Sequence, residues 1–588
     1  MKPNTAAPPT GKYLLFQRFC VPAVVICLFS AFLFSCRHEK QIGTLRIGIA
    51  EEPRTLNIWL ASDANSRKVL SLIYQHLYIR DPETLELTPW LAKEKPVYDP
   101  ETLSYTVTLR DVKWSDGSPL TADDVVFTVD LIKKFNIPMY ISKWRFVEKT
   151  VAVDDRTVRF FLDKPRAIFL TRSMVIPIVS EKEWAERAER ASQKEKPLKA
   201  LLNQKIENPL GCGPFVLKQW RDGAFLYLEK NPHFFGSGRT INGYKLGPNV
   251  DGIIFKIFRS ADVAILALRK NSIDYYWSAI QPGHIDALEQ DENTRVFVSR
   301  KSAFYFMGFN VRKLPFSRAC LRQAVACLID REFIIKRILQ GYADRMSSVV
   351  PEGNVTWHNP ELPSHGAGLS REERIRRAYE LLKSNGYTWE TPPVDREGEV
   401  VEPSPIVTPD GERMERFTIL TPPADYDPHR AACGTIIQEW LKDAGIPASA
   451  RPMSFGALLD KVKAEHDFDA FILGYGSLSL DPDYLRSFFH SKNNKERGWN
   501  MSGYSNPEFD RLADSSAACM KEEERRDLIF RLQDIVIKDV PYIPLYNPHM
   551  IEAVNVNRFT GWVEMVGGIG NLWSISCLEK NTESFDAH

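Results

Sequence analysis

Cys36 is the residue of this 588-residue chain whose neighbours most clearly specify a chemistry. Three positive charges within the first 18 residues precede an apolar run over residues 20–34, and the polar residues 37–40 follow the cysteine. A cationic start, a short apolar middle and a cleavage site are the parts of an export signal. We therefore predict a signal peptide over residues 1–35, which is removed immediately before Cys36.

The residues around Cys36 resemble the lipobox of bacterial lipoproteins. In those proteins the cysteine thiol carries a diacylglycerol and becomes the new N-terminus. The resemblance implies a lipid anchor at Cys36 on the periplasmic side of a bacterial membrane. The alternative is an uncleaved membrane anchor, but the apolar run of about 15 residues is shorter than the roughly 20 that a membrane-spanning helix needs.

Motifs of enzymes and metal sites are missing from the rest of the sequence. It contains no GxSxG, HExxH or GxxxxGK[ST] pattern, and residues 567–570 (GGIG) lack the strand and helix that would flank a nucleotide-binding turn. Six cysteines follow Cys36, without CxxC spacing: Cys212, Cys320, Cys327, Cys433, Cys519 and Cys577. We expect no enzyme activity, no cofactor and no metal site. Buried free thiols are expected for most of these cysteines, although an even number in an exported protein also permits disulfides.

Length and charge narrow the class of protein further. Without residues 1–35 the chain keeps 553 residues and loses three positive charges and no negative one, so its formal net charge changes from +1 to −2. A net charge close to zero gives no indication of the positively charged surface with which proteins bind nucleic acid. The length exceeds what a single hydrophobic core supports, so more than one lobe is expected.

Hydrophobic periodicity predicts strands that alternate with helices, which is typical of an α/β fold. Thr121 and Asp124 form a predicted capping box at the start of a helix over residues 122–134. Residues 388–412 are rich in Pro, Glu and Asp and are predicted to be a surface excursion. The expected strands are 44–50, 105–109, 158–162, 215–220, 225–229, 251–258, 274–277, 304–310, 417–420, 448–451 and 470–473. The expected helices are 67–77, 122–134, 181–202, 261–270, 370–385, 430–444 and 455–464, with helices near 318–339.

Several sequence blocks resemble, in the right order, those of the extracellular solute-binding proteins of peptide and nickel importers, often called family 5. The blocks are LRDVKWSDGSPLTADDVVF (109–127), GCGPF (211–215), EKNPHFFG (229–236), ALRKNSID (267–274), GFN (308–310), YSNPEFD (504–510) and PYIPL (541–545). Most of the long first block is interpreted as scaffold, because its Asp-Gly and Pro residues signal a turn. Asn310 and Asp330 are expected to satisfy nearby backbone groups.

The resemblance implies the two-lobed periplasmic-binding-protein fold (type II, the large three-domain cluster C form) with a hinge between the lobes. Ligand binds between the lobes, and closure of the hinge buries it. The chain is expected to cross between lobes near residues 302–304 and 546–550. The implied domains are lobe I at 42–88, 207–302 and 549–580, an extra domain of lobe I at 89–206, lobe II at 303–548 and a frayed tail at 581–588.

The function implied is that of a monomeric solute-binding subunit of an ABC importer. It would bind oligopeptides or dipeptides by reversible clamping and present them to a membrane permease, while a separate cytoplasmic subunit hydrolyses ATP. One alternative is a non-peptide solute such as a nickel chelate or a small oligosaccharide. Another is a surface receptor that senses its ligand without transport.

The family resemblance also implies the ligand-contacting segments. In lobe I they are Thr55, Leu56 and Asn57, and in lobe II they follow the strand at 470–473. Peptide binders often place an Asp there for the peptide α-amino group, and alignment on Asp481-Pro482 puts Leu478 at that position. Free-amine recognition is therefore expected to be weak. Asp481 is a possible substitute or a helix-capping residue. The predicted ligand-binding residues of lobe II are Tyr475, Ser477, Leu478, Asp481, Trp499 and Tyr504.

Overall fold

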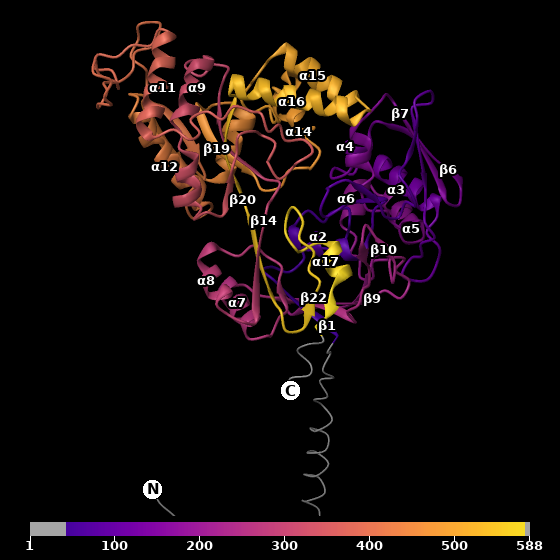
Figure 1. The fold of residues 1–588 in the computed structure, drawn as a ribbon. Coiled ribbons are helices and arrows are strands. Elements are labelled where there is room, and N and C mark those ends of the chain that lie inside the picture. The colour runs from indigo at the N-terminus through magenta and orange to yellow at the C-terminus, as the bar shows by residue number, and fades with distance from the viewer. Residues whose placement is uncertain (1–42, 582–588) are drawn as a thin grey trace, which may run out of the picture. The chain divides into compact units, whose positions relative to one another are not determined.

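The computed structural model describes residues 43–581 of the chain (Figure 1). The predicted signal peptide over residues 1–35, the predicted lipid attachment at Cys36 and residues 582–588 of the predicted tail lie outside the described residues. Residues 45–581 form one compact unit.

A seven-stranded sheet forms the centre of one half of this unit, which we call lobe I. Its alternating apolar residues, such as Leu45, Ile47 and Ile49 of the first strand, are buried. The strands lie in the order β14 (Thr294–Ser299), β21 (Met550–Asn555), β13 (Tyr275–Tyr276), β1 (Thr44–Ile49), β12 (Gly252–Ile257), β9 (Phe225–Lys230) and β8 (Phe215–Arg221). β1 and β13 are parallel, and β21 is antiparallel to both β13 and β14. Helix α2 (Ala64–Ile73) contacts β8, and helix α7 (Ala261–Arg269) contacts β13 and β21.

A six-stranded sheet forms the centre of the other half, lobe II. The strands lie in the order β16 (Ala343–Arg345), β20 (Tyr542–Pro548), β15 (Phe304–Phe309), β19 (Ala470–Tyr475), β17 (Phe417–Thr421) and β18 (Ala448–Pro452). β17 is parallel to both β18 and β19, and β15 is antiparallel to its neighbours. Gly308 of β15 is needed here, because a Cβ atom would lie 2.4 Å from the Phe471 ring. The main helices are α9 (Ala319–Leu328), α11 (Arg371–Ser384), α12 (Pro428–Lys442), α14 (Tyr484–Phe489), α15 (Pro507–Ala518) and α16 (Glu522–Asp539).

A smaller four-stranded sheet lies within residues 97–162. Its order is β4 (Val97–Asp99), β5 (Ser104–Thr108), β7 (Thr157–Leu162) and β6 (Val147–Asp154). Helix α3 (Ala122–Lys134) contacts β6 and β7, and α4 (Ile141–Trp144), α5 (Glu181–Ser192) and α6 (Pro197–Leu202) complete this part. Trp144, Phe160 and Phe169 pack their rings together in its interior. The buried side chains of this part belong to the same core cluster as many of those of lobe I, including Leu45, Ile47 and Tyr275.

The chain passes between the two large sheets twice. It leaves lobe I at the end of β14 and enters lobe II at the start of β15, through residues 300–303. It returns between β20 and β21 at His549. These passages, the first and second crossings, lie close to the predicted ones at 302–304 and 546–550. The domain boundaries themselves stay a prediction.

Most predicted elements are present, with shifts that local chemistry explains. The helix predicted at 67–77 is α2, which begins at Ala64 because the Asp63 side chain accepts a hydrogen bond from the Ser66 N–H at 2.8 Å. The helix predicted at 181–202 is wrong as a single element, because it is divided into α5 and α6 and Pro197 begins the second. The capping box at Thr121 and Asp124 is confirmed.

The predictions for Asn310, Asp330 and the cysteines can also be compared with the structure. Asn310 donates to the carbonyls of His466 and Phe468, and Asp330 caps a short helix through the Phe333 N–H, as expected. The six cysteines after Cys36 are free thiols in the structure. Full burial holds for Cys212, Cys327 and Cys433, whereas the other three are partly exposed.

Between residues 43 and 581, no group of three or more His, Cys, Asp or Glu side chains is arranged to hold a metal ion. Within the same range, no helix is both long and apolar enough to cross a membrane.

Candidate functional site

The sheet of lobe II presents the carboxyl ends of three parallel strands to the crossings. Phe304, the first residue of β15, pairs with Tyr475, the last residue of β19. β17 and β18 run parallel to β19, so their carboxyl ends lie on the same side of the sheet as the first crossing. Ligands of α/β sheets bind at this kind of edge, which we call the crossing edge.

The sheet of lobe I has the same arrangement. Ser299, at the end of β14, pairs with Met550, at the start of β21, so both crossings leave from one edge. β13 is antiparallel to β21 and parallel to β1, so the carboxyl ends of β13 and β1 point to that edge as well. A ligand site between the lobes is therefore expected at the crossing edges of the two sheets.

The predicted segment after β1 is held mainly by contacts within the protein. Asn57 is fully buried, and its side-chain amide donates to the carbonyls of Leu201, Leu202 and Gln204 around the end of α6. Leu56 is buried, and the Thr55 hydroxyl accepts from the Asn57 N–H at 3.0 Å. Asn57 thus connects the segment after β1 to residues 201–204. A ligand contact of these three residues stays a prediction.

The predicted aromatic residues of lobe II differ in their surroundings. The Tyr475 ring is stacked between Phe306, at 5.8 Å, and Phe488, at 4.7 Å. Trp499 is half exposed, lies 6.1 Å from Tyr475 and has the Lys463 ammonium 4.0 Å from its ring. Trp499 therefore offers a surface that a ligand can reach, and Tyr475 is largely covered by its neighbours.

The loop after β19 contacts the first crossing directly. The Leu478 N–H donates to the carbonyl of Ser302 at 2.5 Å, and the Leu478 side chain is 9% exposed. Ser477 is exposed. Tyr504 is buried among aromatic rings and donates its hydroxyl to Asp539, contacts that belong to the core of lobe II. Leu478 and Ser477 lie next to the crossing, whereas Tyr504 is a packing residue, and ligand contacts of all three stay predictions.

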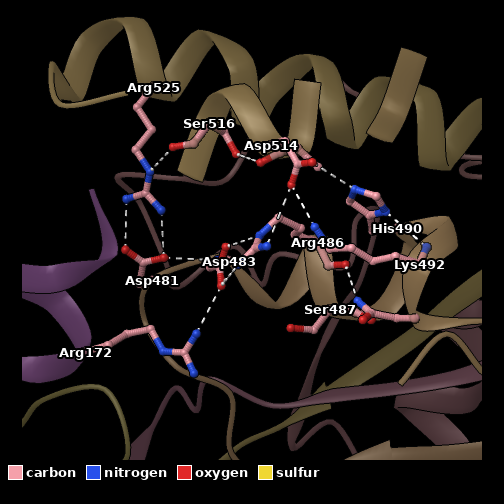
Figure 2. A network of polar contacts seen from close by, with 12 residues as sticks. Arg172, Asp481, Asp483, Arg486, Ser487, His490, Lys492, Asp514, Ser516 and Arg525 are labelled. Atoms are coloured by element: carbon pink, nitrogen blue, oxygen red, sulfur yellow. Dashed lines mark hydrogen bonds and ion pairs between the residues drawn. The ribbon is translucent and has the colours of Figure 1, made fainter. Parts of the chain in front are cut away.

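Asp481 is already engaged with other residues of the protein. It is fully buried and receives two hydrogen bonds from the Arg525 guanidinium, at 2.8 and 2.9 Å (Figure 2). The Thr171 hydroxyl donates to it at 2.7 Å and the Asp483 N–H at 3.0 Å. Burial alone would raise the pKa of Asp481, but the Arg525 charge and these hydrogen bonds outweigh it, and the pKa is lowered. A ligand role for Asp481 stays a prediction that its four contacts do not favour.

The Asp481 cluster also joins the two lobes. Thr171 and Arg172 belong to a single helical turn, Phe169–Ser173, of the part that carries the four-stranded sheet. Arg172 forms an ion pair with Asp483 at 3.0 Å, and the Ala167 N–H donates to the carbonyl of Ala517. Beside these contacts lies a cavity of about 270 Å³, which residues from both lobes line. The structure thus brings the lobes into direct contact here.

Arg430 is a residue at the crossing edge of lobe II that the sequence motifs did not indicate. Asp427 follows β17, caps α12 by accepting from the Arg430 N–H at 2.9 Å, and accepts from the Arg430 Nε at 2.7 Å. The guanidinium lies 5.9 Å from the Tyr305 ring, next to the first crossing, and 5.6 Å from the Phe455 ring. Its Nη1 is buried and has no hydrogen-bond partner among the described residues. A buried guanidinium with a free donor is suited to bind a carboxylate.

Comparison with known proteins agrees with this architecture. The family described as "Bacterial extracellular solute-binding proteins, family 5 Middle" matches residues 86–496. The chain is 26% identical over 534 residues to the oligopeptide-binding protein AppA of Bacillus subtilis, covering 89% of this chain and 90% of AppA.

Two solved structures show the same fold. One is the periplasmic oligopeptide-binding protein of an oligopeptide ABC transporter of Thermotoga maritima, with a TM-score of 0.74 and 22% identity, covering 92% of this chain and all of that one. The other is NikZ of Campylobacter jejuni in complex with Ni(L-His), with a TM-score of 0.66 and 22% identity, covering 90% and 99%. The predicted α/β periplasmic-binding-protein fold is confirmed. The chain belongs to the bacterial extracellular solute-binding proteins of family 5.

Proposed function

We propose that the protein is the extracytoplasmic solute-binding subunit of an ABC importer and that it binds oligopeptides or dipeptides between its two lobes. The observation that supports this most is that both sheets turn their crossing edges toward the two connections between the lobes. The name of the Bacillus subtilis relative, an oligopeptide-binding protein, points to the same class of ligand. The bound solute would be released unchanged to a permease, so no bond is made or broken.

Arg430 is proposed to bind a carboxylate of the solute. Its guanidinium, whose Nη1 has no hydrogen-bond partner among the described residues, lies 5.9 Å from the Tyr305 ring, close to the point where the first crossing enters lobe II. Closure of the lobes would exclude water from a carboxylate bound there, and the carboxylate would gain a charge-assisted hydrogen bond from the guanidinium. Asp427 fixes the opposite side of the guanidinium and so orients the free donor.

A non-peptide solute is the second candidate, because the expected site for a peptide α-amino group offers no free carboxylate. The position expected to hold the α-amino anchor is Leu478, and the nearby Asp481 is fully paired with Arg525. A buried ammonium group without a carboxylate partner is costly. The relative NikZ, solved in complex with Ni(L-His), is a member of this fold with a non-peptide ligand.

The function is tested by identifying the solute and by measuring closure. Mass spectrometry of small molecules released from the purified protein by denaturation is expected to show a peptide. Small-angle scattering with alanine peptides of two to five residues is expected to show a smaller radius of gyration for those that bind. An unchanged scattering profile with every peptide and with the released solute would contradict a clamping mechanism, and chemical alteration of the solute would contradict a pure binding function.

Acetylation of the peptide α-amino group is expected to change affinity little, by less than about threefold. The reason is that Leu478 offers no charge to an ammonium and Asp481 is occupied. Calorimetric titration with matched free and N-acetylated alanine peptides measures this directly. A loss of tenfold or more on acetylation would show that another carboxylate binds the α-amino group.

The lipid anchor at Cys36 is a separate proposal, which rests on the resemblance to the lipobox. Cys36→Ser is expected to release the protein from the membrane fraction, because the serine hydroxyl is not acylated in place of the thiol. Cys27→Ser, which changes a cysteine inside the predicted signal peptide, is the matched control and should leave the protein attached. Retention of the Cys36→Ser protein in membranes would instead indicate an uncleaved anchor.

A further inference from the structure

Two lysines lie at the crossing edge of lobe I without a carboxylate partner at ion-pair distance. Lys68, on α2, donates its ammonium group to the carbonyl of Trp277, which directly follows β13, and lies 5.5 Å from the Trp277 ring. Lys301 lies in the first crossing, and its carbonyl accepts from the Asn547 side chain at 2.6 Å. Between residues 43 and 581, no Asp or Glu oxygen comes within ion-pair distance of either ammonium group.

Glu552 is the carboxylate whose charge reaches both lysines, but its oxygens are used elsewhere. It is fully buried on β21, accepts the Tyr275 hydroxyl on one oxygen and accepts the Ile569 N–H at 2.7 Å on the other. Burial raises the pKa of Glu552, which weakens it further as a counter-charge. Two partly buried cations therefore share, at most, one negative charge that does not touch them.

This arrangement has an energetic cost in the absence of ligand. Burial lowers the pKa of Lys68 to about 8 and also lowers the pKa of Lys301. A desolvated ammonium without an anionic partner destabilises the state that buries it. An anionic group of a bound solute would remove this cost, since charge-assisted hydrogen bonds are the strong ones. The closed state would then be favoured specifically by an anion.

We propose, resting on the proposed function, that the solute carries a second anionic group, and that Lys68 and Lys301 bind it while Arg430 binds the first. The position of Lys301 supports this assignment. It precedes Ser302, whose carbonyl accepts the Leu478 N–H of lobe II, so Lys301 lies where the two lobes meet. The ligand class is an oxyanion-rich solute, either a peptide with an acidic side chain or a non-peptide polycarboxylate.

The test compares solutes that differ only in charge. Alanine peptides of two to five residues with Glu as the second residue are titrated against the same peptides with Gln, and citrate serves as the non-peptide polycarboxylate. We expect one of two results. Either at least one Glu peptide binds about tenfold or more tightly than its Gln partner, or citrate binds although no Glu or Gln peptide does. The first result identifies an acidic peptide, and the second a non-peptide polycarboxylate.

Substitution of each lysine tests whether Lys68 and Lys301 cause the preference for the anionic solute. Lys68→Gln and Lys301→Gln are each expected to remove most of the advantage of the Glu peptide, or of citrate binding. Lys218→Gln, which changes an exposed lysine of β8 that pairs with Glu229, is the matched control and should keep it. Unfolding midpoints measured without ligand show whether any variant is merely misfolded. If one lysine variant does not fold, the other carries the test.

Three outcomes would overturn the inference, and they differ in what they say of the proposed function. Equal affinity for Glu and Gln peptides, with closure by both, would contradict the inference and leave the peptide-binding function intact. A charge preference that survives in both lysine variants would also contradict it. Absence of closure with every peptide and with citrate would contradict the proposed function together with the inference.

Discussion

Replacing Asp481 by alanine is expected to lower the free energy of unfolding by about 3–5 kcal/mol. The Arg525 side chain is 5% exposed and that of Asp481 is not exposed at all, so removal of the carboxylate leaves a buried guanidinium without its counter-charge. The variant also removes the acceptor of the Thr171 hydroxyl and of the Asp483 N–H. Breaking such a pair by truncating one partner costs more than the pair itself contributes.

Urea unfolding followed by circular dichroism measures this effect, provided that the transition stays cooperative. The matched control is Asp467→Ala, because Asp467 pairs with Lys461 on the exposed surface and such a pair contributes about 0–1 kcal/mol. The double variant Asp481→Leu with Arg525→Met is expected to recover much of the loss, since no unpaired charge remains. A loss below about 1 kcal/mol in Asp481→Ala would show that water or a rearranged side chain compensates Arg525.

The same ion pair makes a contribution that depends on pH. The pKa of Asp481 is lowered in the folded protein, so folding favours its ionised form. This stabilisation is therefore fully present above the ordinary carboxyl pKa of about 3.9 and is lost as the pH falls through the lower folded pKa. The stability difference between the wild type and Asp481→Ala should accordingly be largest near neutral pH and shrink only in strong acid.

The individual helices and strands were largely predictable from the sequence because their signals are local, whereas the two-lobed arrangement was implied only by the family resemblance. The strand at 44–50 alternates apolar residues, and the helix at 122–134 opens with Thr121 and Asp124, and both are present. The single helix expected at 181–202 was wrong because Pro197 outweighs the Ala-rich helical pattern. The spacing of apolar residues indicates whether a single segment is a helix or a strand and which of its faces is buried, and each of these features lies within one segment.

The surroundings of the candidate site were less predictable, because they depend on distant parts of the chain. Asp481 is paired with Arg525, 44 residues later, and with Thr171, 310 residues earlier, and no spacing rule connects them. Asn57 follows β1, as expected for a ligand segment, but its amide is used to hold residues 201–204. A usable signal did exist for Arg430, because Asp427-Pro428 marks a helix start that follows β17, a strand parallel to both of its neighbours.

Arg430→Gln is expected to weaken binding of a peptide with a free carboxylate by about a hundredfold, which is about 2.7 kcal/mol. The glutamine keeps a hydrogen-bonding group but loses the charge and the fork of donors that fits a carboxylate. The prediction is specific to one end of the ligand. Amidation of the peptide C-terminus should cost the wild type about as much as the substitution does, and should cost the variant almost nothing, because the interaction has already been removed.

Arg374→Gln is the matched control for this experiment. Arg374 is also a buried arginine of lobe II paired with an aspartate, Asp330, but it lies on α11 rather than at the crossing edge. Its replacement should lower stability without changing peptide affinity, so comparison of the two variants separates loss of a ligand contact from general loosening of lobe II. If amidation and Arg430→Gln weaken binding additively, the peptide carboxylate is bound elsewhere. Arg430 would then have a structural role, in which it holds Asp427 and the neighbouring aromatic rings in place.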